Sequence, residues 1–373
     1  MKILFVVFDG GGNIPPQLAV ARSLRARGAE VRFLGHHGVR QRVEDDGFPF
    51  ATFTSGTNFD PTLQRPLLHM MMSMTRVAMD HRLGRDAVRA AHRHHADVVV
   101  VDVLLTAAIY EVAAQGIPTV VFGHCFYRTI QDLAAGPIGW LMRLRGTPPN
   151  RLERTGALQI VTARAELDPT RGTPAVRHVG VVWQGIPAVA SPLPVPRILI
   201  SLSTVAYAGQ RRMLQRILDA IEPLPVRATV TVGPAIESSG LRVPANSSMH
   251  AWLDHDEVLA TASLVVGHGG HSTAMRALSF GVPLVIMPAN TLIDQRRVGA
   301  AIQRLGAGIL LRKHAGVRRI RAAISAVLQD PAYREAAGMF GAEIRRGDGA
   351  EVAAAAISQF ATASTGHALR QRH

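Results

Sequence analysis

The sequence predicts an α/β protein made of two doubly wound domains, each a parallel sheet covered by helices on both faces. Three observations predict this class. Residues 2–8 and 97–103 are almost continuously apolar, as in strands that are buried on both faces. Residues 17–27 between such runs have the apolar spacing of a helix. At residues 197–202 the series restarts, because RILISL resembles MKILFV at residues 1–6.

The remaining elements follow the same alternation in chain order. In the first half we expect strands at residues 30–34 and 118–122, with a helix at 107–115. In the second half the expected elements are helix 210–221, strand 227–232, strand 263–267, helix 272–280, strand 283–287 and helix 294–305. Residues 330–360 are rich in Ala and helical in pattern.

A proline-rich segment, VASPLPVP, predicts a linker at residues 189–196. The expected domains are therefore residues 1–188 and 197–355, followed by a tail at 356–373 that packs back on the N-terminal domain. Because ligands of doubly wound sheets lie beyond the carboxyl ends of the strands, we expect both sets of loops to face one cleft.

Composition limits the class of function. The 373 residues are 47% hydrophobic and 18% charged, which is typical of a globular protein. No apolar run reaches the roughly 18 residues of a membrane span, and Cys125 is the single cysteine, so we expect a cytoplasmic protein. The net charge is +14, but the basic residues are dispersed and aromatic residues are only 5%. We therefore expect no nucleic-acid partner, while weak adsorption to an anionic membrane stays open.

Residues 263–295 carry the most specific signal. A buried strand leads into His268-Gly269-Gly270-His271-Ser272-Thr273, then a short helix, a second strand and Asp294-Gln295. Glycines and hydroxyls at a turn from strand to helix allow backbone N–H groups to approach a phosphate. The pattern predicts a site for a nucleotide sugar.

With its spacing, this segment resembles the family 1 glycosyltransferases of GT-B fold, especially those of bacterial natural products and macrolides. The family pattern His-Gly-Gly-x-Gly-Thr-x-x-Glu-Ala-Leu, Gly-Val-Pro and Asp-Gln is matched by residues 268–278, 281–283 and 294–295. Residues 252–255, Trp-Leu-Asp-His, resemble the Trp-x-Pro-Gln segment that precedes it. The resemblance implies two Rossmann-like domains and an inverting sugar transfer that needs no metal and no cofactor besides the nucleotide sugar.

The resemblance also implies the donor-binding residues. The base stacks on Trp252, the diphosphate lies against His268 and the turn at Gly270, and Asp294 and Gln295 bind sugar hydroxyls. The other donor-binding residues are Ser203, Thr204, Ser272 and Thr273. His268 and fixed dipoles would neutralise a departing UDP or dTDP.

Three donor-site residues depart from the family pattern. Arg276 stands where a glutamate normally accepts hydrogen bonds from the ribose, and an Arg cannot accept. We expect the ribose to be held in another way and Arg276 to be available for a phosphate. Ser203 and Ser272 replace glycines where the backbone normally approaches the ligand.

A larger departure follows the first strand. The family carries Gly-His-x-x-Pro there, and its histidine deprotonates the acceptor; this chain reads Gly12-Asn13-Ile14-Pro15-Pro16. Asn13 can orient an acceptor by hydrogen bonds but cannot take its proton.

Three explanations are open: another residue is the base, the acceptor needs little base help (an N- or C-glycosylation), or the protein is an inactive auxiliary partner. The candidate bases are Asp102, where the family aspartate orients the histidine, Asp9 and His124. Each also has a structural interpretation: Asp102 can cap a helix, Asp9 can bind the glycine loop, and His124 can be a core histidine.

We expect the acceptor to be small and largely apolar and to contact residues 54–82 and 124–145. Met70, Met74 and Phe126 are the candidate contacts, although ordinary core packing explains the Met-rich segment equally simply. A lipid acceptor at a membrane surface is the alternative. The chain is expected to be a monomer or a homodimer.

Overall fold

The computed structural model describes residues 1–183, 188–290 and 293–370, which form two compact units. The first unit comprises Met1–Asp60, Leu68–Gln184 and Asp348–His373, and the second comprises Pro61–Leu67 and Gly185–Gly347. The predicted boundary at residue 188 adjoins residues 184–187, which lie outside the described residues.

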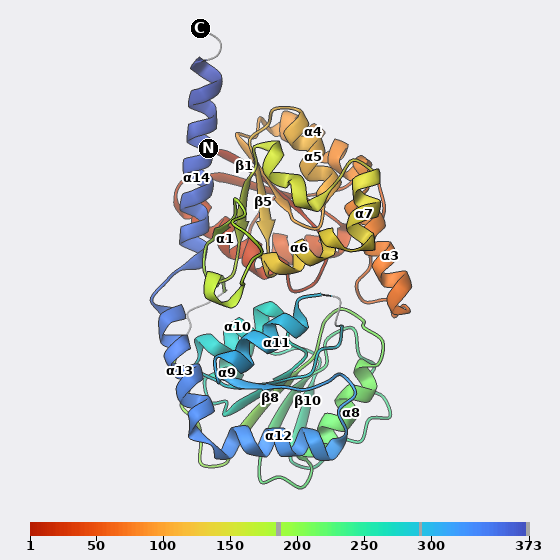
Figure 1. Ribbon diagram of the computed structural model, residues 1–373, viewed down its shortest axis with the longest axis vertical. Coiled ribbons are helices and arrows are strands. Elements are labelled where there is room, and N and C mark those ends of the chain that lie inside the picture. Colours follow the sequence, from red (N-terminus) through yellow and green to blue (C-terminus); the bar gives the residue numbers. More distant parts are fainter. Residues whose placement is uncertain (184–187, 291–292, 371–373) are drawn as a thin grey trace. The chain divides into compact units, whose positions relative to one another are not determined.

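A seven-stranded sheet forms the centre of the first unit, in the order β3-β2-β1-β4-β5-β6-β7 with every pair parallel (Figure 1). Its strands are β1 (Lys2–Val7), β2 (Glu30–Gly35), β3 (Phe50–Thr52), β4 (Val98–Asp102), β5 (Thr119–Gly123), β6 (Leu158–Val161) and β7 (Arg177–His178). Its helices are α1 (Ile14–Ala26), α2 (Arg40–Glu44), α3 (Leu67–Ala78), α4 (His81–His94), α5 (Thr106–Ala114), α6 (Tyr127–Ala135), α7 (Pro137–Leu144) and α14 (Gly349–Arg370).

Strand β1 shows why this sheet is covered on both faces. Phe5 belongs to a hydrophobic cluster with residues of α1 and α14, while Leu4 belongs to a second cluster with residues of α4 and α5. Because successive strand residues point to opposite faces, a strand between two apolar layers must be apolar throughout. The continuous Val/Ile/Leu/Phe pattern of residues 3–8 meets this requirement.

Helix α14 completes the first unit by packing on α1, and Ile357 is fully buried there. The helix is continuous from Gly349, so the sequence-based division between 355 and 356 falls inside it. A Cβ on Gly349 would lie 2.4 Å from the carbonyl oxygen of Val181, which explains the glycine at this close approach. Asp348 Oδ1 accepts hydrogen bonds from the N–H groups of Ala350 and Glu351 and so fixes the start of the helix.

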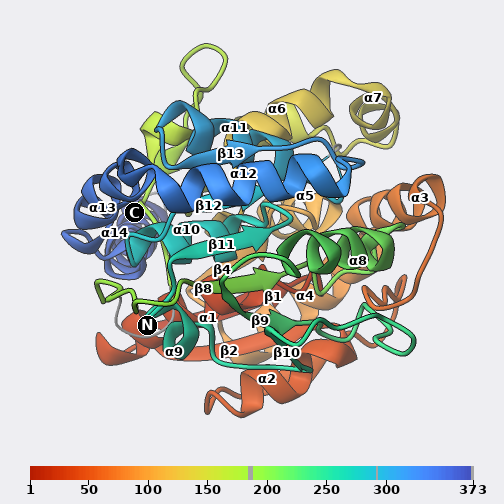
Figure 2. The same cartoon turned by 90° about the horizontal axis from the view of Figure 1, so that it is seen from below.

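The second unit has a six-stranded parallel sheet in the order β10-β9-β8-β11-β12-β13, which can be followed across Figure 2. Its strands are β8 (Arg197–Ser201), β9 (Arg227–Thr231), β10 (Ser247–His250), β11 (Leu264–Gly267), β12 (Leu284–Ile286) and β13 (Gly308–Leu310). Its helices are α8 (Gln210–Ile221), α9 (His255–Leu259), α10 (His271–Ser279), α11 (Gln295–Arg304), α12 (Val317–Gln329) and α13 (Pro331–Arg345). The short edge strands β10 and β13 were not predicted, because neither contains a long apolar run.

Strand register determines which loops meet in each unit. In the first, Val6 is level with Val101, and Asp102 with Phe122, so the segments after β1, β4 and β5 emerge at one edge of the sheet. In the second, Gly267 is level with Ser201, which places the segments after β8 and β11 together. The candidate bases and the predicted phosphate-binding residues lie at these strand ends, whereas Trp252 follows β10, and Asp294 and Gln295 follow β12.

Candidate functional site

The first unit holds a buried polar cluster at the carboxyl ends of β1, β4 and β5. The side chain of Asp102 is fully buried, and its Oδ2 accepts hydrogen bonds from Asn13 Nδ2 at 2.7 Å and Gln17 Nε2 at 2.9 Å. Its Oδ1 accepts from the N–H of Leu104 at 2.9 Å. Three donors therefore hold the carboxyl group of Asp102, and none of its side chain is exposed.

Asn13 makes hydrogen bonds inside the first unit, and its expected role in orienting an acceptor stays a prediction. It is 2% exposed and lies just before α1. Besides its bond to Asp102, Nδ2 donates to the carbonyl of Phe8 at 2.8 Å, and Oδ1 accepts from the N–H of Gly10 at 3.1 Å. Because these bonds already use both amide hydrogens and the amide oxygen, the side chain stabilises the glycine loop.

His124 lies just beyond β5, and its Nδ1 is 3.3 Å from Asp102 Oδ2. Its side chain keeps 15% of its surface exposed, whereas that of Asp102 keeps none. The third candidate, Asp9, is 4% exposed and accepts a hydrogen bond from Arg42 Nη2 at 3.0 Å. The structure thus joins two of the three candidate bases, Asp102 and His124, and ties Asp9 to a cation.

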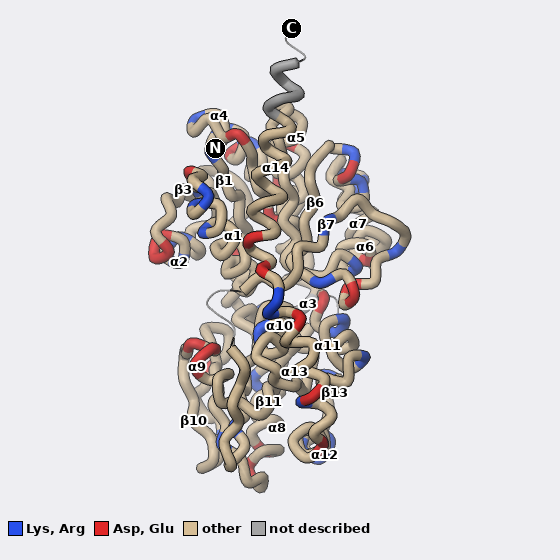
Figure 3. The backbone as a smooth tube through the Cα atoms, turned by 90° about the vertical axis from the view of Figure 1, so that its left-hand side faces the viewer, with Lys and Arg blue, Asp and Glu red and all other residues tan. Residues whose placement is uncertain are grey.

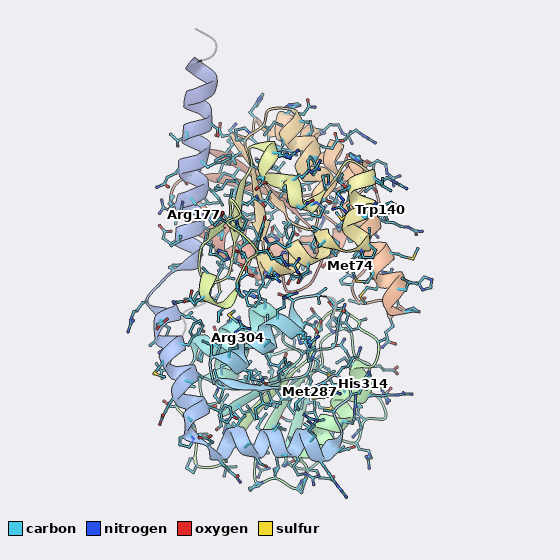
Figure 4. The ribbon with its side chains drawn as sticks, viewed as in Figure 1. Met74, Trp140, Arg177, Met287, Arg304 and His314 are labelled. Atoms are coloured by element: carbon cyan, nitrogen blue, oxygen red, sulfur yellow. The ribbon has the colours of Figure 1, made fainter. Side chains whose placement is uncertain are left out.

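The predicted acceptor contacts lie mostly in the interior. Met70 is 2% exposed and Phe126 is 1% exposed, so both pack in the core, and their contact with an acceptor stays a prediction. Met74 is half-buried on α3 and packs against the hydrophobic core. Met74 is labelled in Figure 4 together with Trp140 of α7.

Sequence reasoning missed the exposed apolar side chains of α7. Trp140 is 58% exposed and Leu144 is 64% exposed. Their spacing of four residues, with Leu141 between them, places them on one face of the helix, and this signal was readable in residues 140–144.

In the second unit, a tight turn joins β11 to α10. Gly269 has φ +81°, and a Cβ there would lie 2.7 Å from the carbonyl oxygen of Gln295, so glycine is needed on both counts. No side chain caps the first turn of α10, where Ser272 and Thr273 are half-buried. A helix start of this kind presents N–H groups that suit an anion.

His268 lies between β11 and this turn and is 8% exposed. Burial, opposed by the backbone carbonyl of Ser201, lowers the pKa of His268 to about 4. The ring is therefore neutral near pH 7 and serves as a hydrogen-bonding group. The expected contact of His268 with a departing diphosphate stays a prediction.

The segment after β8 reaches the same edge of the sheet. Ser203 is buried; its N–H donates to Gln210 Oε1 at 3.0 Å, and its Oγ accepts from the N–H of Val205 at 3.0 Å. Thr204 is exposed. Ser203 therefore shapes the loop, and Thr204 offers the accessible hydroxyl.

Trp252, just before α9, is 79% exposed. A tryptophan so exposed is not a core residue, and its ring face is open to a flat partner.

Arg276 of α10 forms a two-pronged ion pair with the carboxylate of Asp256, and its Nη2 is 3.6 Å from Asp254 Oδ1. The acidic residues of α9 are drawn red in Figure 3. Arg276 is thus engaged with carboxylates, and its contact with a phosphate stays a prediction.

Asp294 and Gln295 are both buried at the start of α11. Gln295 Oε1 accepts hydrogen bonds from the N–H groups of Ala289 and Asn290, both at 2.8 Å, and so fixes the loop after β12. Asp294 lies close enough to Tyr207 that its charge, added to burial, raises the pKa of that phenol. The amide oxygen of Gln295 is therefore used structurally.

Two properties of the described residues bear on metal binding and on membranes. Residues 1–183, 188–290 and 293–370 contain no group of three or more His, Cys, Asp or Glu side chains able to hold a metal ion. Within the same ranges, no helix combines the length and apolarity of a membrane span.

Comparison with known proteins places these features in a family context. Residues 215–358 match the model of the "Erythromycin biosynthesis protein CIII-like, C-terminal domain". The chain is 27% identical over 374 residues to the elloramycin glycosyltransferase ElmGT of Streptomyces olivaceus, covering 92% of this chain and 94% of that protein. It is 33% identical over 214 residues to a PGL/p-HBAD biosynthesis glycosyltransferase of Mycobacterium tuberculosis (strain ATCC 25177 / H37Ra), covering 54% of this chain. The chain spans about half of that relative's length, 48%.

A solved structure gives the fold. The glycosyltransferase VinC, crystallised in complex with dTDP, superimposes with a TM-score of 0.73 at 19% identity, covering 97% of this chain and 100% of that one. The chain therefore has the GT-B fold of two Rossmann-like domains.

Proposed function

We propose that the chain is a glycosyltransferase that moves a sugar, with inversion, from a UDP- or dTDP-sugar to a small, largely apolar acceptor. The observation that carries this proposal is the uncapped start of α10 behind the His268-Gly269-Gly270 turn. The names of the matched relatives support sugar transfer, and the dTDP complex of VinC supports the class of donor.

The geometry indicates a role for each donor-site group. The diphosphate would accept hydrogen bonds from N–H groups and hydroxyls of the first turn of α10, including Thr273. Neutral His268 would donate one further hydrogen bond. Trp252 would stack on the base, and Asp294 would bind a sugar hydroxyl. These fixed dipoles favour negative charge where the leaving diphosphate develops it.

The ribose requires a different partner from the usual glutamate. Asp254 is next but one to Trp252, and its side chain is 49% exposed. A carboxylate accepts hydrogen bonds from ribose hydroxyls, so Asp254 is our candidate for this role. Arg276 would hold the two carboxylates of α9 in position.

The test begins with the donor. Purified protein is screened with UDP-, dTDP- and GDP-sugars by thermal shift, and turnover is then measured against a panel of apolar phenols and alcohols. We expect stabilisation by at least one nucleotide sugar, its loss in His268→Ala, and turnover that persists in EDTA. An absence of both binding and turnover across the panel would favour the inactive auxiliary protein instead.

A lipid acceptor at a membrane surface is the second candidate, and a specific observation favours it. Trp140 and Leu144 of α7 and Leu68 of α3 are exposed, and Arg143 and Arg145 flank the apolar face of α7. Tryptophan beside arginine suits the interface of an anionic bilayer. The matched mycobacterial relative is named for PGL/p-HBAD biosynthesis.

Vesicle flotation tests the second candidate. Binding to vesicles containing phosphatidylglycerol, but not to pure phosphatidylcholine, and its loss in the Trp140→Ala/Leu144→Ser double variant would support a membrane acceptor. Failure to float with either vesicle would leave the small acceptor. Cytoplasmic location and a monomeric or dimeric state stay predictions.

A further inference from the structure

We propose that His124 is the general base of the transfer reaction and that Asp102 is its positioning residue. The imidazole would then come from the loop after β5, whereas in the family pattern it comes from the loop after β1. This inference rests on the proposed function, because a base has a task only if an acceptor is glycosylated.

The sheet explains why such a move is possible. Strands β1 and β5 lie on either side of β4, whose last residue is Asp102. The loop after β1 supplies Asn13, 2.7 Å from Asp102 Oδ2, and the loop after β5 supplies His124, 3.3 Å from the same oxygen. One buried carboxylate thus serves side chains from both neighbouring strands.

The exposure of the two side chains shows which of them an acceptor can reach. Asp102 has no exposed side-chain surface, and three donors already use its oxygens. An acceptor hydroxyl therefore cannot reach it. His124 keeps 15% exposure, so it can touch both the carboxylate and a bound molecule.

The two other candidates near this cluster, Asn13 and Asp9, are poorly suited to take a proton from an acceptor. The Asn13 amide has no useful basicity and is committed to internal hydrogen bonds. Asp9 is 4% exposed and bound to Arg42.

The step balances as follows. Asp102 Oδ2 favours the tautomer with hydrogen on His124 Nδ1, which leaves the lone pair on Nε2. Nε2 takes the acceptor's O–H proton as the acceptor oxygen forms a bond to the anomeric carbon. The bond from that carbon to the diphosphate oxygen breaks, and its electron pair leaves with the nucleoside diphosphate. The buried carboxylate stabilises the imidazolium.

The first experiment compares two histidines that each lie beside a fully buried aspartate. His178 Nε2 lies 3.0 Å from Asp168 Oδ2, and the side-chain exposures are 14% and 0%. His178→Gln therefore controls for the loss of a histidine beside a buried carboxylate. We expect His124→Gln to lower kcat by about 10²- to 10⁴-fold, the usual effect of a general base. Nucleotide affinity stays unchanged in both variants, and His178→Gln keeps its turnover.

The pH profile separates catalysis from structure. Wild-type kcat/KM should rise with pH through one ionisation in the histidine range, and His124→Gln should lose that limb. Asp102→Asn removes the charge that favours imidazolium, so its limb should move to lower pH. Because Asp102→Asn disturbs a buried cluster, its folding is checked by urea denaturation, and the conclusion rests on His124→Gln.

The tautomer of His124 gives an independent readout. Imidazole ¹⁵N NMR of the ligand-free protein should show His124 protonated at Nδ1.

The outcomes distinguish the two proposals. No turnover by wild-type protein with any nucleotide sugar overturns the proposed function. Wild-type turnover that His124→Gln retains, with its pH limb intact, overturns only the assignment of His124.

Discussion

Removing the exposed indole of Trp252 should weaken nucleotide binding without weakening the fold. The side chain is 79% exposed, so Trp252→Ala removes little buried surface, and we expect a free energy of unfolding within about 0.5 kcal/mol of wild type. Stacking of a base on an aromatic ring contributes about 1–3 kcal/mol. At 1.4 kcal/mol per tenfold, Kd for the bare nucleoside diphosphate should rise about 5- to 150-fold.

The assay is isothermal titration with UDP and dTDP, paired with urea denaturation. Trp252→Phe should keep most of the affinity, since a smaller ring still stacks. Trp140→Ala is the matched control, because Trp140 is also exposed, at 58%, but lies in the other unit. If Trp252→Ala binds within twofold of wild type while Trp140→Ala does too, the indole is no platform for the base.

Two further predictions concern the donor-site loops. Gln295→Ala leaves the buried N–H groups of Ala289 and Asn290 without their acceptor, so the free energy of unfolding measured in urea should fall by about 2–4 kcal/mol. The control is Gln303→Ala, which loses one exposed hydrogen bond from the N–H of Leu310 and should lower the free energy of unfolding by less than about 1 kcal/mol. Because burial lowers the pKa of His268 from 6.5 to about 4, the stability it contributes is complete above pH 6.5 and is lost as pH falls toward 4. Urea denaturation at pH 7 and 5 should show about 2 kcal/mol more loss in wild type than in His268→Gln, and equal losses would contradict a neutral buried ring.

The fold was predictable from sequence because its strands are buried on both faces. Residues 98–101 are four valines with no exposed surface, and such a run has few alternatives to a central parallel strand. The tail at residues 356–373 was expected to pack back on the N-terminal domain, but the surface of α1 that it meets was not predictable. Helix α14 returns to the first unit because small alanines let it approach α1 closely, and the alanines alone do not show which surface they will meet.

The turn at the donor site could be predicted from the sequence, because a motif determines local geometry. The candidate base could not, because it depends on a contact between residues far apart in the chain. The His268-Gly269-Gly270 turn is local, and it forms as its glycines require. The approach of His124 to Asp102 joins two loops through strand register, and nothing near either residue distinguishes this histidine from the other 15. Phe126 shows the converse: an aromatic residue beside the same loop turned inward, where burial stabilises it more than exposure.

The two departures from the family pattern, at Asn13 and Arg276, have a feature in common. In the first unit the imidazole is absent from its usual loop, yet the buried carboxylate that would support it faces another imidazole across the neighbouring strand. In the second, Arg276 stands where the family pattern has a glutamate, and it pairs with Asp256 of α9 and lies near Asp254, which precedes that helix. In each case the residue that departs from the family pattern is held by a polar partner: Asn13 donates to Asp102, and Arg276 pairs with Asp256. A site in decay has no reason to keep such partners together, so these pairings favour a working enzyme over an inactive auxiliary protein.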